Sequence, residues 1–206
     1  MKVTDIFFSL QGESTFAGLP CIFIRLSGCN LRCSYCDTKE SWTDGIDMTI
    51  EQILGAVNQF SCKLVELTGG EPLLQSDAVT FMNLLSNKGY TVLLETNGSL
   101  PLQTVPSSVH IICDVKLPGS GHPDSFLISN LQRLNSHYDE LKFVVSNKSD
   151  FDFAVRFIKT NRLQDFTLLF SPVYNSLDAS LLAEWILASG LPLRLNLQLH
   201  KLIGLP

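Results

Sequence analysis

Short apolar runs alternate with amphipathic segments along most of this sequence, and this alternation constrains the fold more than any other feature. The runs are rich in aliphatic residues and occupy positions 21–26, 64–68, 91–95, 110–115, 141–145, 166–170 and 193–197. Several are apolar almost throughout, which is typical of parallel strands that are buried on both faces. Because strands that alternate with helices form right-handed parallel crossovers, the sequence predicts an α/β fold.

Helix end signals separate several of these runs. Thr49 and Gln52 form a capping box ahead of an apolar stretch. Ser76 and Ser149 are predicted to begin two further helices, and Gly190 is predicted to end a helix that starts near position 177. These signals place helices between the predicted strands.

The length of the chain limits the number of strand–helix units. A closed eightfold barrel takes about 250 residues, whereas this chain has 206. Six or seven units fit, so we expect either a partial, open barrel or a doubly wound sheet, with residues 1–206 in a single domain. In both folds ligands bind at the carboxyl ends of the strands, and polar or glycine-rich segments follow those ends here.

Composition excludes several classes of function. The chain has 20 acidic and 15 basic residues, a net charge of −5, which argues against a surface that wraps nucleic acid. No apolar run approaches the roughly 20 residues that span a bilayer, and residues 1–10 lack the apolar core of a signal peptide. We therefore expect a cytoplasmic protein without a membrane partner, in which six cysteines do not form disulfides.

Three of the cysteines, Cys29, Cys33 and Cys36, have the spacing C-x3-C-x2-C directly after a predicted strand. A structural zinc site needs four ligands, and no fourth Cys or His follows at a suitable spacing. Three thiolates on a cubane cluster leave one iron free to bind a substrate or cofactor, whereas four-cysteine clusters leave none. The sequence favours a catalytic iron–sulfur cluster over zinc or three unconnected thiols, and it predicts that the other three cysteines are small buried residues.

This spacing, with Tyr35 before the last cysteine, resembles the signature of radical S-adenosylmethionine (SAM) enzymes. The segment Gly69-Gly70-Glu71-Pro72 looks like the motif with which that superfamily contacts the methionine part of SAM. The resemblance implies an incomplete TIM-like β/α barrel with six or seven parallel strands, the radical SAM fold. It also implies a 4Fe–4S cluster and SAM as cofactors, which together release a 5′-deoxyadenosyl radical.

Further segments resemble the 7-carboxy-7-deazaguanine synthase family, from residue 6 to the end of the chain. They are residues 8–13, 18–20, 23–25, 28–31, 36–38, 68–72, 95–98, 114–121 and 198–201. The resemblance implies conversion of 6-carboxy-5,6,7,8-tetrahydropterin to 7-carboxy-7-deazaguanine with loss of ammonia, on the route to queuosine and other 7-deazapurines. It also implies a homodimer, an electron donor such as flavodoxin or ferredoxin, and no catalytic side chain beyond the cluster and its cofactor.

The same resemblance assigns site residues one by one. The cluster ligands match Cys29, Cys33 and Cys36, and Mg2+ matches the Thr38 hydroxyl. Positions that match SAM contacts are Tyr35, Cys36, Asp37, Gly70, Glu71, Asp114, Val115, Lys116, Ser171, Pro172, Val173 and Tyr174. Positions that match substrate contacts are Leu10, Gln11, Gly12, Glu13, Arg25, Thr68, Asn97 and Pro206. Glu95 is a further candidate for hydrogen bonding to the ribose or the substrate.

Two of these assignments have an independent physical argument. Arg25 ends an apolar strand, where an isolated cation is costly unless it is paired, so either the substrate carboxylate or an internal Asp or Glu should meet it. Residues 198–206 follow the last predicted strand and carry four Leu or Ile side chains, so we expect this tail to fold back over the site. One departure from the family is Ser14-Thr15, where many members have Gly.

Two other classes of function remain open at this point. One is an activase of a glycyl-radical enzyme, which shares the cysteine spacing and size but acts on a protein partner. The other is a non-catalytic module, either an iron–sulfur electron carrier or a zinc-stabilised protein. Reductive cleavage of SAM separates enzymes from modules, and conversion of the pterin separates a synthase from an activase.

Overall fold

The computed structural model describes all 206 residues and contains one nine-stranded sheet in the order β3-β1-β2-β4-β5-β6-β7-β8-β9. The strands are β1 (Lys2–Leu10), β2 (Pro20–Leu26), β3 (Ile46–Asp47), β4 (Leu64–Gly69), β5 (Thr91–Thr96), β6 (His110–Asp114), β7 (Glu140–Val145), β8 (Thr167–Pro172) and β9 (Leu193–Leu195). From β2 to β9 all neighbours are parallel. The sheet thus has seven parallel strands, which confirms the expected six or seven, and the edges β3 and β9 do not close the barrel.

The sequence did not predict β1 and β3, which extend the sheet as antiparallel strands. The segment of β1 has no regular alternation of apolar and polar side chains, and its burial pattern along the strand is correspondingly mixed. Its pairing with the apolar β2 over Phe7, Phe8 and Leu10 forms the strand nonetheless. Residues 2–10 thus belong to the sheet and lead directly into the segment between β1 and β2.

Five α-helices accompany the strands: α1 (Ile50–Val57), α2 (Asp77–Asn87), α3 (Lys148–Asn161), α4 (Ala179–Ser189) and α5 (Leu199–Ile203). Thr49 and Gln52 form the expected capping box, and Gly190 ends α4 in the left-handed conformation. One predicted start was imprecise, because Asn147, not Ser149, caps α3. Ser76 is the N-cap residue of α2 as expected, but its side chain makes no capping hydrogen bond.

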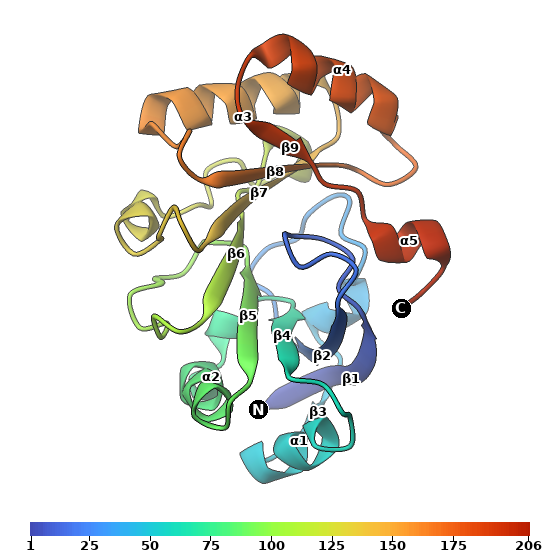
Figure 1. Cartoon of the computed structure of the whole chain (residues 1–206), viewed down its shortest axis with the longest axis vertical. Helices are drawn as coiled ribbons and strands as arrows, with labels where there is room; N and C mark the ends of the chain where they lie inside the picture. Colours follow the sequence, from blue (N-terminus) through green and yellow to red (C-terminus); the bar gives the residue numbers. More distant parts are fainter.

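Helices α1 to α4 lie along the outer side of the curved sheet, whereas α5 and the C-terminus lie on the opposite side, near β1 and β2 (Figure 1). The main core fills the space between the outer helices and the sheet. Its largest fully buried side chains include Phe81 of α2, Phe143 of β7 and Phe170 of β8. Burying an aromatic or large aliphatic side chain contributes about 1.5–3 kcal/mol, so this core holds the strand ends in fixed positions. None of the helices combines the length and the apolar character that a membrane span requires.

Candidate active site

A cavity of about 510 Å³ opens at the carboxyl ends of the parallel strands and collects most of the candidate residues. This is the end of the sheet at which open α/β folds bind ligands. The candidates that line it are Leu10, Gln11, Gly12, Glu13, Arg25, Cys29, Cys33, Tyr35, Cys36, Asp37, Thr38, Thr68, Gly70, Glu95, Asn97, Asp114, Lys116, Val173, Tyr174 and Pro206. Segments from both ends of the chain and from six strands, β1, β2, β4, β5, β6 and β7, therefore surround one space.

Four candidates for SAM contacts do not line this cavity, namely Glu71, Val115, Ser171 and Pro172. Glu71 is fully buried and accepts hydrogen bonds from Thr96 Oγ1 and from the Asn97 backbone N–H. Ser171 is also buried, and its hydroxyl accepts a hydrogen bond from the Asn196 side chain. The side chains of Glu71 and Ser171 thus hold the walls of the site together.

Backbone hydrogen bonds anchor the loop that carries the three cysteines. The Glu71 N–H donates to the Gly28 carbonyl at 2.7 Å, and the Gly70 N–H donates to the Leu26 carbonyl at 3.0 Å. A Cβ on Gly70 would lie 2.1 Å from the Gly28 carbonyl oxygen and 2.9 Å from the Cβ of Cys29. Only glycine permits this approach, so the predicted motif after β4 directly supports the cysteine loop.

The three thiols line the same cavity, and none of the other three cysteines does. Burial raises the pKa of Cys29 and Cys33, and the nearby Lys116 ammonium acts in the opposite direction. No group of three His, Cys, Asp or Glu side chains converges closely enough to hold a single metal ion. A four-iron cluster is wider than a single ion, so its ligands need not converge as closely as those of one metal ion. Three thiols without a fourth cysteine therefore fit the ligand set of such a cluster.

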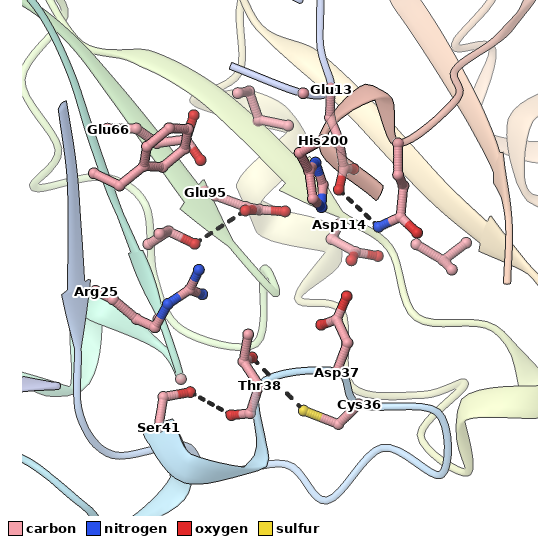
Figure 2. A pocket seen from close by; sticks show the side chains of 18 of the residues that line it. Glu13, Arg25, Cys36, Asp37, Thr38, Ser41, Glu66, Glu95, Asp114 and His200 are labelled. Carbon is pink, nitrogen blue, oxygen red and sulfur yellow. Dashed lines mark hydrogen bonds between the residues drawn. The ribbon is translucent and has the colours of Figure 1, made fainter. Parts of the chain in front are cut away.

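Arg25 extends from β2 towards the middle of the cavity (Figure 2). Its guanidinium lies over the ring of Phe7, 5.5 Å from the ring centroid. No Asp or Glu forms an ion pair with it, and it makes no side-chain hydrogen bond within the protein. The sequence predicted that Arg25 would meet either the substrate carboxylate or an internal Asp or Glu, and the structure contains no such internal partner. A half-buried guanidinium facing a cavity suits an anionic ligand.

A network of charged side chains forms the wall opposite the cysteines. Lys142 of β7 donates to Glu13 Oε2 at 3.0 Å and also pairs with Glu95. Glu95 Oε2 accepts from the Thr68 hydroxyl at 3.0 Å. Burial alone would raise the pKa of Glu95, but Lys142 reverses this effect and lowers that pKa to about 2.

Glu66 of β4 belongs to the same wall and differs from Glu95 in charge. It is 2% exposed, and its Oε2 accepts a hydrogen bond of 2.7 Å from the Gln11 side chain. Burial, and then the neighbouring Glu95 carboxylate, raise the pKa of Glu66 to about 8. Near neutral pH the wall therefore combines a neutral carboxyl group at Glu66 with an ionised one at Glu95.

Asp114 ends β6 between this wall and the cysteines. Its Oδ2 accepts from Lys116 Nζ at 2.8 Å. Its Oδ1 is the single buried side-chain nitrogen or oxygen atom in the protein without a hydrogen-bond partner. Because an unsatisfied buried acceptor is costly, this atom is suited to a donor group on a ligand.

The C-terminal segment folds back against the site as expected, but polar contacts hold it there, because Leu202, Ile203 and Leu205 are exposed. The Leu199 N–H donates to the Gly12 carbonyl at 2.8 Å, and the carbonyl of Pro206 accepts from Ser9 Oγ at 2.9 Å. His200 lies beside Glu13 (Figure 2), and a Cβ on Gly12 would come within 2.0 Å of His200 Nδ1. Glycine at position 12 is thus required for the close approach of the tail.

The departure at Ser14 has a conformational consequence. Ser14 has a φ of +59°, in the left-handed region that favours glycine. Its hydroxyl accepts a hydrogen bond from the Phe16 N–H, and the following Thr15 donates to the buried Glu140. Local hydrogen bonds therefore stabilise Ser14 in a conformation that favours glycine.

Several residues that line the cavity were given no role from the sequence, among them Glu66, Lys142, His200 and Lys201, although residues 198–201 belong to a segment that resembles the family. The available signal was a charged residue inside an otherwise apolar strand, as with Glu66 in β4 and Lys142 in β7. Such a residue is rarely fully buried unless it is paired. Lys201 of α5 pairs with Asp37 beside the last cysteine, a contact that no local pattern indicates.

Comparisons with known proteins agree with this geometry. The family model of the Radical SAM superfamily matches residues 23–117. A 7-carboxy-7-deazaguanine synthase of Koribacter versatilis is 43% identical and covers 100% of this chain and 98% of its own. A synthase of the same name from Chlorobaculum tepidum is 42% identical, covering 100% and 95%. The crystal structure of QueE from Escherichia coli superimposes with a TM-score of 0.79 at 25% identity, covering 97% of this chain and 94% of that one.

Proposed function

This chain belongs to the 7-carboxy-7-deazaguanine synthase family of radical SAM enzymes, and we propose that it converts 6-carboxy-5,6,7,8-tetrahydropterin to 7-carboxy-7-deazaguanine. The reaction contracts a ring, releases ammonia and serves the biosynthesis of queuosine or another 7-deazapurine. The observation that carries the proposal is one cavity that contains both three thiols without a fourth cysteine and the unpaired Arg25.

The cysteine side of the cavity is suited to the cluster and SAM. Cys29, Cys33 and Cys36 would hold a 4Fe–4S cluster, which when bound supplies the electron that cleaves SAM to a 5′-deoxyadenosyl radical. The close backbone approach at Gly70 fixes the cysteine loop against the segment after β4 that would contact the methionine part of SAM. The unsatisfied Asp114 Oδ1 would accept from a SAM donor group, an amino or a ribose hydroxyl.

Other SAM contacts are proposed on position. Tyr35, Asp37, Lys116, Val173 and Tyr174 line the cavity, and backbone groups of residues 71, 115, 171 and 172 flank them. The Tyr35 hydroxyl is fixed by its hydrogen bond to the Val144 carbonyl. These residues would orient the cofactor and keep water away from the reacting C–H bond.

The opposite side of the cavity is suited to the pterin. Arg25 would bind the substrate carboxylate with two parallel hydrogen bonds. Glu13 would present an acceptor to the aminopyrimidinone edge, Gln11 beside it is a further candidate contact, and the chain from Leu10 to Gly12 would supply backbone groups. Thr68 and Asn97 lie at the ends of β4 and β5, and the terminal Pro206 would cover the substrate.

The hydroxyl of Thr38 is our candidate ligand for Mg2+. It lies 3.9 Å from Cys36 Sγ and lines the cavity. Mg2+ prefers oxygen ligands and retains several waters, so one protein hydroxyl together with substrate oxygens would complete its coordination. The ion would fix the pterin against the cysteine side.

Three further features are proposed from family membership. The protein would act in the cytoplasm, as a homodimer, and would receive electrons from a donor such as flavodoxin or ferredoxin. Size-exclusion chromatography with light scattering tests the dimer. Reduction by each carrier, followed by SAM cleavage, tests the donor.

The proposed reaction is tested by mass spectrometry after anaerobic incubation of reconstituted protein with reductant, SAM, Mg2+ and the carboxytetrahydropterin. We expect 7-carboxy-7-deazaguanine and ammonia in equal amounts. Arg25→Met should raise the pterin KM about tenfold to a hundredfold, because a charge-assisted bidentate contact is lost, while SAM cleavage without pterin continues. Cleavage of SAM without any deazaguanine in the wild type would refute the proposed substrate and favour an activase.

A further inference from the structure

Lys142 occupies an unusual position for a lysine. It lies in the middle of β7, is 4% exposed, and its strand neighbours Leu141 and Phe143 are fully buried in the core. Burying an ammonium group is costly unless its charge is balanced. Three carboxylates surround it, and each comes from a different part of the chain.

Two of these carboxylates make direct contacts with Lys142. Its Nζ donates to Glu13 Oε2 at 3.0 Å from the segment after β1, and it pairs with Glu95 of β5. The third, Asp114 of β6, has its Oδ2 at 3.8 Å from the same nitrogen. Lys142 is therefore the cation that joins the segment after β1 to the ends of two parallel strands.

The two contacted carboxylates are also held from a second side. Glu13 Oε1 accepts from Gln198 Nε2 at 2.8 Å, and Glu95 Oε2 accepts from the Thr68 hydroxyl at 3.0 Å. Gln198 Oε1 in turn accepts from Lys201 Nζ at 2.8 Å. The orientation of both carboxylates depends on Lys142, and for Glu13 it also depends on the C-terminal segment.

From this arrangement we propose that Lys142 is a positioning residue for the pterin, which holds the carboxylates of Glu13 and Glu95 turned towards the ligand. Lys142 acts through these two carboxylates, which accept hydrogen bonds from N–H groups of the substrate. The inference rests on the proposed function, because it concerns the pterin side of the cavity and not the cysteine side. An ionised carboxylate accepts from an N–H group, whereas a protonated one presents a competing donor.

The charges around this group explain why a lysine is needed. The charged groups that face Glu95 are Lys142, Lys116 and Glu66. Those that face Glu13 are Lys142 and His200. Asp114 also lies near Lys142, and Asp37 near His200. Lys142 offsets burial and holds the pKa of Glu95 at about 2. Without the ammonium, the neighbouring carboxylates would repel one another, and at least one would take up a proton as the pH falls.

The test compares three variants of the reconstituted holoenzyme. Lys142→Met keeps the length of the side chain and removes its charge, and Lys142→Arg keeps the charge. Lys148→Met is the matched control, because Lys148 pairs with Asp152 on the exposed surface of α3. Pterin KM and kcat are measured between about pH 6 and pH 9, together with iron content and SAM cleavage in the absence of pterin.

We expect Lys142→Met to raise the pterin KM about tenfold or more at neutral pH, because this corresponds to the loss of one charge-assisted hydrogen bond to the substrate. We also expect kcat/KM of this variant to fall at acid pH, where the wild-type value does not. Lys142→Arg should reduce both effects, and Lys148→Met should show neither. In Lys142→Met, SAM cleavage without pterin should change less than about threefold, because Lys142 contacts Glu13 and Glu95 on the pterin side of the cavity.

Two outcomes would overturn the inference. The first is a Lys142→Met enzyme with the wild-type pH profile and pterin KM. The second is a fall in pterin turnover that only parallels a loss of iron and of SAM cleavage, since this indicates a structural role. If Lys142→Met does not fold, Lys142→Met/Glu95→Gln removes the charge imbalance, and wild-type kcat/KM in that variant would equally refute positioning. Failure of the proposed function is distinct, because wild-type enzyme itself would then not convert the pterin.

Discussion

Substitution of Glu66 by Gln should make the stability of this protein less dependent on pH. Glu66 is 2% exposed in β4, and its carboxyl group accepts a hydrogen bond from Gln11. Burial and the neighbouring Glu95 raise its pKa from the ordinary value of 4.5 to about 8. Because the native carboxyl group holds its proton more tightly than the unfolded one, native stability is lost as the pH rises.

The size of the effect follows from the difference between the two pKa values. The gap between 4.5 and about 8, at about 1.36 kcal/mol per pH unit, corresponds to about 5 kcal/mol when both states are fully ionised. Between about pH 5 and pH 8, about 3–4 kcal/mol of this is lost from the free energy of unfolding of the wild type. In the Glu66→Gln variant the amide oxygen still accepts from Gln11, and the side chain has no proton to lose.

Thermal unfolding of the reconstituted protein under anaerobic conditions measures this difference. For a chain of this size each kcal/mol corresponds to about 2–4 °C in Tm. The Tm of Glu66→Gln relative to wild type should therefore increase by about 7–14 °C from pH 5 to pH 8. Glu184→Gln makes the same chemical change on the exposed face of α4 and should show a constant difference. A Glu66→Gln difference that is also constant with pH would refute the reasoning.

Three further predictions concern the cluster loop and the tail. Gly70→Ala should lower the iron content and weaken SAM binding, because its Cβ would lie 2.1 Å from the Gly28 carbonyl oxygen; iron per chain close to that of wild type would contradict this. Cys33→Ser should abolish the visible absorbance of the reconstituted cluster, whereas Cys62→Ser, outside the cavity, should retain it; equal spectra would disprove the ligand assignment. A peptide tag added after Pro206 should raise the pterin KM about tenfold, since the chain end lines the cavity; unchanged kinetics would exclude a contact with substrate.

Much of the fold could be predicted from the sequence because the parallel strands are buried on both faces. β4, β6 and β7 are almost wholly buried, and continuous apolar runs mark such strands. β1 carries no such run, and pairing with β2 decides its conformation. The five-residue α5 depends on a backbone contact with Gly12, so no local propensity predicts it.

The cysteine side of the site was more predictable than the opposite wall. The cysteine spacing and the glycines near Gly70 are local patterns with a direct geometric purpose. The pairing of Lys142 with Glu13 depends on residues 129 positions apart in the chain, and on the register that places Asp114 beside Lys142. The sequence contains the charges, but only the folded sheet shows which of them meet.

The central claim is that three protein thiols hold the cluster and leave one iron for SAM. Electron paramagnetic resonance of the reduced enzyme tests it most directly, with SAM carrying a nitrogen-15 label in its amino group. We predict that SAM changes the cluster spectrum and that the labelled nitrogen couples to the cluster. A spectrum that is identical with and without SAM, in an enzyme with a full complement of iron, would contradict the account.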